Sequence, residues 1–559
     1  MDKILFLIPP HITFEAFTRP AFNQKVAAKS GVVFGQPVTD MPLGVLILSA
    51  YTKRHADVET RLVDFNVLLN RMQAFEHTSF SSFFREILAR EIAEFTPTIV
   101  GISALFSPNY RSLLDLADCC RELLPEAIII GGGGVPTNMY AQIFRESTSF
   151  DALCFGEGER PLAGLLQAGD KREYLESHAS WMTPAKVNRH AVPVHDFIEE
   201  LDEIPFPDYG ICDPSAYALN PAITAYGSLG DKQQNFHVMT SRGCPYRCCF
   251  CSSHTVHGRE MRYYSVERVK QDLRQLTKDY GAKTLVFQDD HLLADRRRAL
   301  EIIHFVRELG VTAVFQNGLA LYALDREMLE ALKGAGVHQL VLSVESGSGR
   351  VLNKIMHKPL TPNTIKRVAR DCRELGIYTN VNVMIGLPGE TKADIEDARQ
   401  FLRTLDANWF SVLCATPLVG SEMLDICLKN DYIDGSYMDC DFKKPIVRTE
   451  EFTPEYIQET AYELNLDLNF VHNADIRLGQ YETALKGFQN AIRARQDHAL
   501  AYYFAGQCYG GLGDSSKEQE CRAAAMKMTA DSAFWQRYAK RFDVPLGGAV
   551  EEECLTRGN

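Results

Sequence analysis

Residues 236–251 read Phe-His-Val-Met-Thr-Ser-Arg-Gly-Cys-Pro-Tyr-Arg-Cys-Cys-Phe-Cys, a short apolar run followed by a loop with glycine, proline and clustered thiols. Three of these thiols, Cys244, Cys248 and Cys251, follow the spacing C-x3-C-x2-C. Thiolate is the soft ligand that iron-sulfur clusters need, and three cysteines leave one iron of a cubane without a protein ligand. The stretch therefore predicts a cluster with an open iron at the end of a strand.

The sequence after this loop alternates apolar strands with helical stretches. Each expected strand ends in a polar or glycine-containing turn, which is typical of the catalytic edge of a parallel α/β barrel. The expected strands are residues 284–287, 313–315, 340–344, 380–385 and 409–413. Together with the strand before the cysteines they predict a (β/α)6 partial barrel.

The cysteine spacing, with Phe250 before the last thiol, resembles the signature of the radical S-adenosylmethionine (SAM) superfamily. The resemblance implies a [4Fe-4S] cluster that binds SAM at its open iron, receives an electron from a donor and cleaves SAM to a 5'-deoxyadenosyl radical. It also implies SAM contacts from Phe250, Asp289, Asp290, Asn317, Glu345, Gly386 and Leu387. The alternatives are a zinc site completed by His254 or His257, and polar residues that only cap the following helices.

The chain before the cysteine loop has its own strand pattern. Residues 4–8, 61–63, 99–103 and 127–130 are strand candidates, and each ends where a loop begins. This pattern predicts a doubly wound, Rossmann-like α/β sheet that binds a ligand at the carboxyl ends of its strands. Runs of glycine in its loops let the backbone approach a bulky ligand and offer free amide donors.

Two of these loops, Ser103-x-Leu105 and Gly132-Gly133, resemble in order and type the loops that enclose the nucleotide tail of vitamin B12 in cobalamin-binding domains. Residues 155–159 and 204–209 resemble the segments that end this domain in B12-dependent radical SAM enzymes. The resemblance implies cobalamin contacts from Ser103, Leu105, Gly132, Gly133, Thr137, Gly156 and Glu157. The alternative is a sheet that only covers the barrel.

The histidine motif D-x-H-x-x-G, which supplies the lower cobalt ligand in other B12 proteins, has only a partial counterpart in Asp64-Phe65-Asn66. His11 follows the first strand without that motif, and we interpret it as a loop residue. The radical branch of the family commonly lacks the histidine, so its absence is compatible with cobalamin binding.

The C-terminal sequence is helical and repeats with a period of 34, since Leu478-Gly479 recurs as Leu512-Gly513. It resembles a tetratricopeptide repeat, with packing or dimerisation and recruitment of a peptide or protein as the two possible roles. The expected domains are a B12-binding domain (1–170), a linker (171–230), the radical SAM barrel (231–435), a helical extension (436–474) and an all-α repeat region (475–545).

Composition limits the partners and the compartment. A net charge of -13 argues against nucleic acid, which needs a field of basic side chains. No run is apolar enough for a membrane span, and no export signal is recognised. Because the 15 cysteines are an odd number without a secretory leader, a reducing, cytoplasmic setting is expected. Cysteines outside the motif are expected to be inert, with an auxiliary cluster as the alternative.

The combined cofactors predict an enzyme that methylates an unactivated carbon. A radical would remove hydrogen from the substrate, cobalamin would carry the methyl group, and a second SAM would remethylate the cobalt. The alternatives are a B12-dependent radical SAM cyclase or rearrangement enzyme without methyl transfer, and a cluster-bearing sensor or binding protein. The substrate is an unknown small molecule, or a peptide or protein bound through the repeats.

Overall fold

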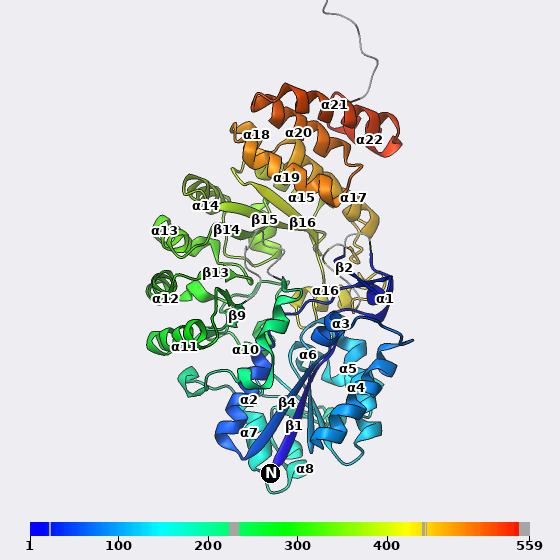
Figure 1. Ribbon diagram of the computed structural model, residues 1–559, viewed down its shortest axis with the longest axis vertical. Helices are drawn as coiled ribbons and strands as arrows, with labels where there is room; N and C mark the ends of the chain where they lie inside the picture. The colour runs from blue at the N-terminus through cyan, green and yellow to red at the C-terminus, as the bar shows by residue number, and fades with distance from the viewer. Residues whose placement is uncertain (22–23, 223–233, 439–441, 443, 547–559) are drawn as a thin grey trace, which may run out of the picture.

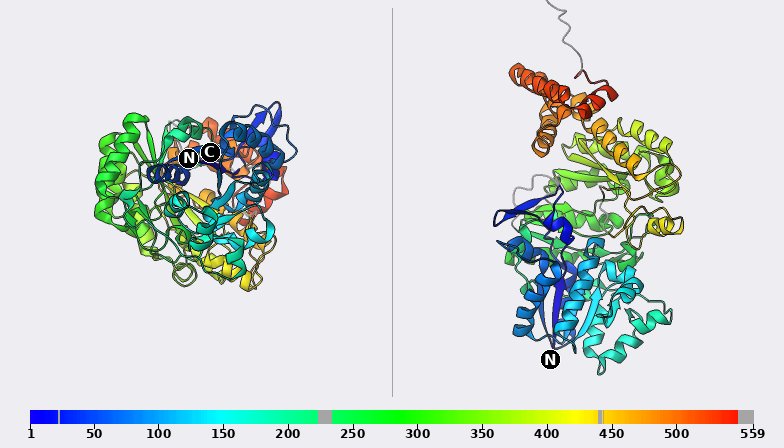
Figure 2. Two further views of the ribbon diagram at one scale, coloured as in Figure 1. Left: turned by 90° about the horizontal axis from the view of Figure 1, so that it is seen from below. Right: turned by 90° about the vertical axis from the view of Figure 1, so that its right-hand side faces the viewer.

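The computed structural model describes residues 1–21, 24–222, 234–438, 442 and 444–546. Residues 223–230 of the expected linker and 231–233 of the expected barrel lie outside this part of the chain. Three bodies follow one another along the long axis, with the N-terminal sheet at one end, the barrel in the middle and the C-terminal helices at the other end (Figure 1). The turned view in Figure 2 has the same order.

The N-terminal body is a six-stranded sheet with the order β4-β1-β5-β6-β7-β8. Its strands are parallel except the last, which pairs antiparallel with β7. Their bounds are β1 Asp2–Ile8, β4 Val58–Asp64, β5 Ile99–Ser103, β6 Ile128–Gly132, β7 Ala152–Cys154 and β8 Trp181–Met182. The doubly wound sheet is confirmed, and its order reverses beside β1, the point where such sheets bind ligands.

Successive side chains of β1 point to opposite faces of this sheet, and each face is covered by its own set of helices. Ile4 and Phe6 pack against one set of helices, and Leu5 and Leu7 pack against the other. The first set is α2 (Leu43–His55) and α7 (Glu159–Gln167). The second set is α4 (Phe80–Phe95), α5 (Tyr110–Leu123) and α6 (Gly134–Glu146). A small antiparallel hairpin, β2 (Val26–Lys29) with β3 (Val32–Gly35), was not predicted.

The middle body contains the six predicted barrel strands with helices outside them (Figure 1). In the described residues they pair as two three-stranded parallel sheets, β9-β12-β13 and β14-β15-β16. The strands are β9 Asn235–Val238, β12 Thr284–Phe287, β13 Thr312–Phe315, β14 Gln339–Glu345, β15 Tyr378–Ile385 and β16 Trp409–Cys414. The helices are α11 Val266–Asp279, α12 Arg296–Leu309, α13 Arg326–Gly334, α14 Pro362–Glu374 and α15 Lys392–Leu402.

The C-terminal helices cover the open edge of the barrel at β16. The side-chain amide of Asn469 accepts from the backbone N–H of Phe410 (2.7 Å) and donates to its carbonyl (2.8 Å), as a neighbouring strand would. This contact satisfies an edge strand that would otherwise be open to another chain. α17 (Pro454–Leu466) packs along the same strand.

The 34-residue period corresponds to pairs of helices. The first pair is α19 (Tyr481–Ala494) with α20 (Ala499–Gly511), and the second is α21 (Ser515–Ala530) with α22 (Ala533–Arg541). Gly479 and Gly513 occupy equivalent turns with φ of +71° and +82°. A helical C-terminal region is confirmed, while its tetratricopeptide character stays a prediction. Among the described residues, no helix is both long enough and apolar enough to cross a membrane.

Candidate functional site

The cysteine loop leaves β9 through β10 (Ser241–Arg242) and returns through α10 (His254–His257) and β11 (Arg262–Tyr263). β10 and β11 pair antiparallel, so the loop is closed at its base. Gly243 has φ of +93°, and a Cβ there would lie 2.2 Å from the carbonyl of Glu260. Glycine is therefore needed directly before Cys244, where the backbone must turn tightly.

The three motif thiols are half-buried on this loop. Burial raises the pKa of Cys248 to about 11, with smaller contributions from Cys244 and Cys251, so the three thiols lie close enough to interact. A positively charged cluster core would bind these groups as thiolates and so lower their pKa. Three neighbouring thiols within reach of solvent fit a cubane with one open iron. Among the described residues, no group of three or more His, Cys, Asp or Glu side chains, the motif cysteines included, is placed to hold a single metal ion, so the zinc alternative is not tested.

Cys249 has a different environment from its neighbours. It is buried, its N–H donates to the carbonyl of Met356 (3.0 Å), and its carbonyl accepts from Met423 (2.8 Å). These bonds hold the cysteine loop against the segments that follow β14 and β16. The position fits the prediction of a thiol without a metal role, which stays a prediction.

Asp289 anchors the strand that leads into the loop. Its carboxylate accepts from Thr240 Oγ1 (2.7 Å), Thr240 N (3.1 Å) and Ser241 Oγ (2.6 Å). Arg298 donates to the carbonyl of Thr240 at 2.6 Å. Asp289 thus has a full set of protein partners, and the structure gives it a role in holding the loop in addition to the predicted SAM contact.

Other predicted SAM residues remain accessible at the carboxyl ends of the strands. Asp290 is partly exposed and close enough to Cys244 to raise the pKa of that thiol, after the larger effect of burial. Asn317 is exposed and donates to the carbonyl of Gln288 (2.8 Å). The ring of Phe250 lies 5.8 Å from the ammonium of Lys358.

Glu345 ends β14 in an unusual conformation. Its φ is +65°, and the register of β14 with β15 shifts between Ser343 and Glu345. Its buried carboxylate pairs with Lys358 at 3.0 Å. Backbone strain at a strand end is common at functional sites. Sequence reasoning missed Lys358, because it lies 13 residues beyond Glu345 without a motif of its own.

Gly386 and Leu387 follow β15, and their amides point at a carboxylate of the same loop. Glu390 Oε2 accepts from Gly386 N (2.6 Å) and Leu387 N (3.2 Å). Burial raises the pKa of Glu390 to about 8. The two amides of the predicted SAM contact are bound within the loop and the Leu387 side chain is fully buried, so a SAM contact at Gly386 and Leu387 stays a prediction.

The predicted cobalamin loops meet at the carboxyl edge of the sheet. Ser103 ends β5 beside Gly132 at the end of β6. Gly133 has φ of +98°, and a Cβ there would lie 2.6 Å from the carbonyl of Ala104. Leu105 is 59% exposed and its neighbour Phe106 is 53% exposed. Close backbone approach next to an exposed apolar pair fits a large flat cofactor.

Thr137 and Gly156, two further predicted cobalamin residues, bond to each other. Thr137 Oγ1 accepts from the N–H of Gly156 at 3.2 Å. α6, which starts at the glycine loop, also contacts α10 of the cysteine loop, since Asn138 donates to Thr255 Oγ1 at 2.9 Å. The two predicted cofactor loops are therefore linked through neighbouring helices.

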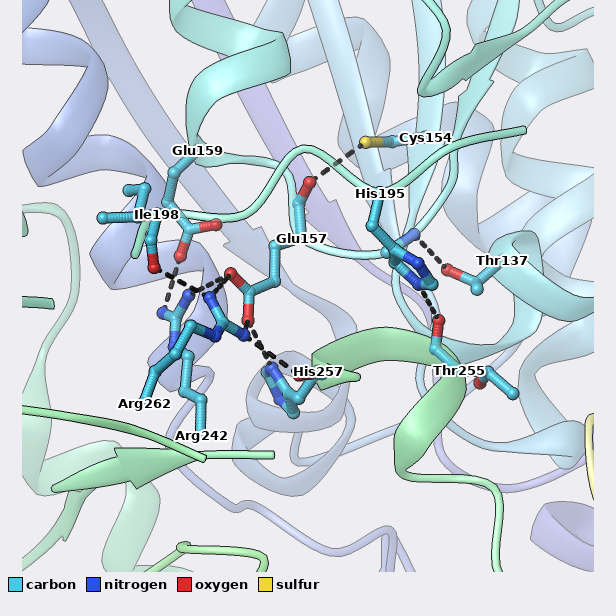
Figure 3. A network of polar contacts seen from close by, with 11 residues as sticks. Thr137, Cys154, Glu157, Glu159, His195, Ile198, Arg242, Thr255, His257 and Arg262 are labelled. Atoms are coloured by element: carbon cyan, nitrogen blue, oxygen red, sulfur yellow. Dashed lines mark hydrogen bonds and ion pairs between the residues drawn. The ribbon is translucent and has the colours of Figure 1, made fainter. Parts of the chain in front are cut away.

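Glu157 lies in a buried network between the sheet domain and the cysteine loop (Figure 3). It binds Arg262 with both oxygens, Arg242 at 3.0 Å and His257 at 2.9 Å, and Glu159 binds Arg242 at 2.7 Å. Burial opposes the ionisation of Glu157, but the Arg242 charge and the hydrogen bonds from His257 and Arg262 outweigh it and hold its pKa well below its ordinary range.

The carboxylate of Glu157 faces two arginines, and the cobalamin contact expected of this residue stays a prediction. Sequence reasoning missed both arginines. Arg242 could have been noticed, since it stands two residues before Cys244.

His11 lies just beyond the carboxyl end of β1, where its backbone N–H donates to Asn66 Oδ1 at 2.6 Å. Its ring packs edge-on against Phe106 at 5.5 Å. Burial lowers the pKa of His11. These contacts fit the loop residue that the sequence predicted.

A doubly wound α/β sheet thus lies next to a partial barrel that carries a three-thiol loop. Residues 238–402 match the family model of the Radical SAM superfamily, and residues 33–166 match that of the B12 binding domain. The chain is thus a radical SAM enzyme with an N-terminal B12-binding domain. Its cofactors are a [4Fe-4S] cluster, SAM and cobalamin.

Comparison with known proteins agrees with this assignment. The chain is 27% identical over 464 residues to the uncharacterized methyltransferase PH0819 of Pyrococcus horikoshii, covering 82% of this chain and 90% of that protein. It is 27% identical over 419 residues to cytidylyl-2-hydroxyethylphosphonate methyltransferase of Streptomyces wedmorensis, covering 68% and 77%. The solved structure of the radical SAM methyltransferase TsrM from Kitasatospora setae, with cobalamin and a [4Fe-4S] cluster bound, has a TM-score of 0.56 at 16% identity, covering 95% and 100%, and shares the fold.

Proposed function

We propose that this protein is a cobalamin-dependent radical SAM methyltransferase that adds a methyl group to an unactivated carbon of a small molecule. The observation that carries the proposal is the direct link between the two cofactor loops. α10 of the cysteine loop contacts α6 of the glycine loop, and Glu157 joins the two bodies through Arg242 and Arg262. One substrate carbon can then face both cofactors.

The residues divide into three groups by what they would hold. Cys244, Cys248 and Cys251 would bind the cluster, and the Glu345–Lys358 pair would orient the polar end of SAM beside it. The backbone at Gly132 and Gly133 would accept cobalamin, with Leu105 and Phe106 against its apolar surface. When bound, the cluster and SAM supply a hydrogen-abstracting radical, and cobalamin supplies the methyl group.

The task of this chain is to align these groups and to exclude water. The exposed apolar pair Leu105 and Phe106 would become covered on cofactor binding, which removes apolar surface from solvent at the reaction site. The buried Glu157 network keeps the loop that carries the thiols in one position relative to the sheet. Fixed geometry matters because a radical reacts with whatever lies nearest.

Nucleoside analysis tests the proposal. The protein is purified without oxygen and incubated with cobalamin, SAM and a reductant, and the SAM products are quantified by mass spectrometry. Methyl transfer predicts both S-adenosylhomocysteine and 5'-deoxyadenosine. Formation of 5'-deoxyadenosine alone would contradict it and favour the cyclase or rearrangement alternative. If SAM is not cleaved although the cluster is intact, the result favours the alternative of a cluster-bearing sensor or binding protein.

A further inference from the structure

Three parallel strands place one side chain each in the same row on the inner side of the barrel. His237 of β9 is in register with Val286 of β12, which is in register with Val314 of β13. Residues in one row of a parallel sheet share a face. Val286 and Val314 form a small cluster separate from the core under the outer helices. His237 therefore faces the barrel interior.

A chain of hydrogen bonds connects His237 to Asp40 of the N-terminal body. Gln316 Nε2 donates to Asp40 Oδ2 (3.1 Å), and Gln316 Oε1 accepts from Gln288 Nε2 (2.8 Å). The same Gln288 nitrogen lies 3.2 Å from His237 Nδ1. Asp40 also accepts from the backbone N–H of Ala222 at 2.9 Å.

Asp40 fixes the direction of every bond in this chain, because a carboxylate accepts and cannot donate. The amide nitrogen of Gln316 must face Asp40, so its oxygen faces Gln288. The Gln288 amide nitrogen then donates one hydrogen to Gln316 and the other to His237 Nδ1. With Nδ1 as the acceptor, the neutral imidazole carries its proton on Nε2.

The remaining donor of the ring has no hydrogen-bond partner among the described residues. His237 is 3% exposed, and its Nε2 is buried and unpaired. Leaving a buried donor unpaired is unfavourable because the group has lost its hydrogen bond to water, so most native buried donors are paired. Burial lowers the pKa of His237, with a smaller opposite effect of Asp40, which keeps the ring neutral.

The opposite side of the barrel interior is polar and reached by solvent. Along β15, Asn380 and Asn382 are half-exposed, while Val381 between them is buried against the outer helices. Ser343 of β14 and Ser411 of β16 are also half-exposed, and Ser411 Oγ donates to Asn380 Oδ1 at 3.1 Å. All four side chains are neutral hydrogen-bonding groups.

We propose that His237 is a substrate-binding residue whose Nε2–H donates to a carbonyl or hydroxyl oxygen of a neutral, polar substrate that enters the barrel. The inference rests on the proposed function only in taking the ligand to be the substrate. A neutral oxygen suits the site. The Asp40 carboxylate would repel an anion, and a cation would face the Nε2–H donor of His237. Asn380, Asn382 and Ser411 would bind further polar groups of the same molecule.

The first experiment measures the tautomer of His237. The holoenzyme with oxidised cluster and cobalamin is labelled with 15N-histidine, and His237 is assigned by comparison with His237→Phe. We expect the neutral Nε2–H tautomer in wild type. In Asp40→Asn we expect a mixture of tautomers, because an amide at position 40 can also donate. A pure Nδ1–H tautomer in wild type would overturn the inference.

The second experiment uses acetamide as an uncharged carbonyl probe and acetate as its anionic counterpart. Acetamide should shift the His237 Nε2–H resonance saturably, at the weak affinity expected of four heavy atoms. Acetate should bind at least threefold more weakly. His304→Phe, which removes an exposed histidine from α12, should leave the acetamide response unchanged. No saturable shift, or equal responses to both probes, would contradict a site for a neutral oxygen.

SAM cleavage by the wild-type protein is measured on the same samples. Failure of cleavage, with the tautomer and the acetamide response as expected, would reject the proposed function and retain the binding site. Cleavage with the opposite tautomer would reject the binding site and retain the proposed function.

Discussion

Glu157 binds Arg262 through both carboxylate oxygens, with Nη1 to Oε2 at 2.9 Å and Nη2 to Oε1 at 2.7 Å. Glu157 follows β7 of the B12-binding domain, and Arg262 lies on the strand that closes the cysteine loop. Arg242, two residues before Cys244, binds the same carboxylate. One acidic side chain thus holds both ends of the loop that would carry the cluster.

Glu157→Gln should destabilise the protein strongly, because it leaves the buried Arg262 without an anionic partner and leaves the buried Arg242 with Glu159 alone. We expect the free energy of unfolding to fall by about 3–5 kcal/mol in anaerobic denaturant titrations. The control is Glu94→Gln, whose carboxylate is 72% exposed in its pair with Arg61 and should cost about 1 kcal/mol or less. Equal effects of the two variants would show that the buried network is not a structural link.

Glu390 should make stability depend on pH. Its pKa in the folded state is about 8, raised from 4.5 by burial. The folded state therefore binds more protons than the unfolded state between these pH values. The contribution of Glu390 to the free energy of unfolding is complete below pH 4.5 and is lost as the pH rises through 8.

Between about pH 5 and pH 9, we expect the wild-type free energy of unfolding to fall by roughly a few kcal/mol more than that of Glu390→Gln. Glu396→Gln, an exposed change on α15, serves as the control and should follow the wild type. A Glu390→Gln curve parallel to wild type would contradict the raised pKa.

Lys358→Met should weaken SAM binding, because it removes the cation that pairs with Glu345 beside the cysteines. Loss of a hydrogen bond to a charged group predicts about a tenfold or larger increase in the dissociation constant. Equilibrium binding of labelled SAM to protein of equal iron content measures it. Lys354→Met changes an exposed lysine of the same segment, and similar affinities of the two variants would exclude a specific role for Lys358.

Gly133→Ala should reduce cobalamin binding. The added Cβ would lie 2.6 Å from the carbonyl of Ala104 at φ of +98°, so the loop must shift. Bound cobalamin per folded chain is measured by absorbance after gel filtration. Gly169→Ala adds a methyl group in open space and should bind as wild type does, whereas full loading of Gly133→Ala would place cobalamin elsewhere.

The sequence predicted the strands better than the partners of the side chains. The barrel strands and the sheet of the first domain were predicted because each strand is an apolar run ended by a turn. Glu157 was assigned to cobalamin because its motif was visible, while the arginines that bind it are distant in sequence. The Asp40–His237 chain was missed for the same reason, since it joins residues of two bodies through register and burial.

The proposed reaction uses SAM in two ways, to generate the radical at the cluster and to remethylate the cobalt. The most direct test compares S-adenosylhomocysteine and 5'-deoxyadenosine formed by wild type, Cys248→Ala and Gly133→Ala under reducing, anaerobic conditions with cobalamin. We predict that wild type forms both nucleosides, that Cys248→Ala loses 5'-deoxyadenosine, and that Gly133→Ala loses mainly S-adenosylhomocysteine. Undiminished 5'-deoxyadenosine from Cys248→Ala, or wild type that forms no S-adenosylhomocysteine, would contradict the account.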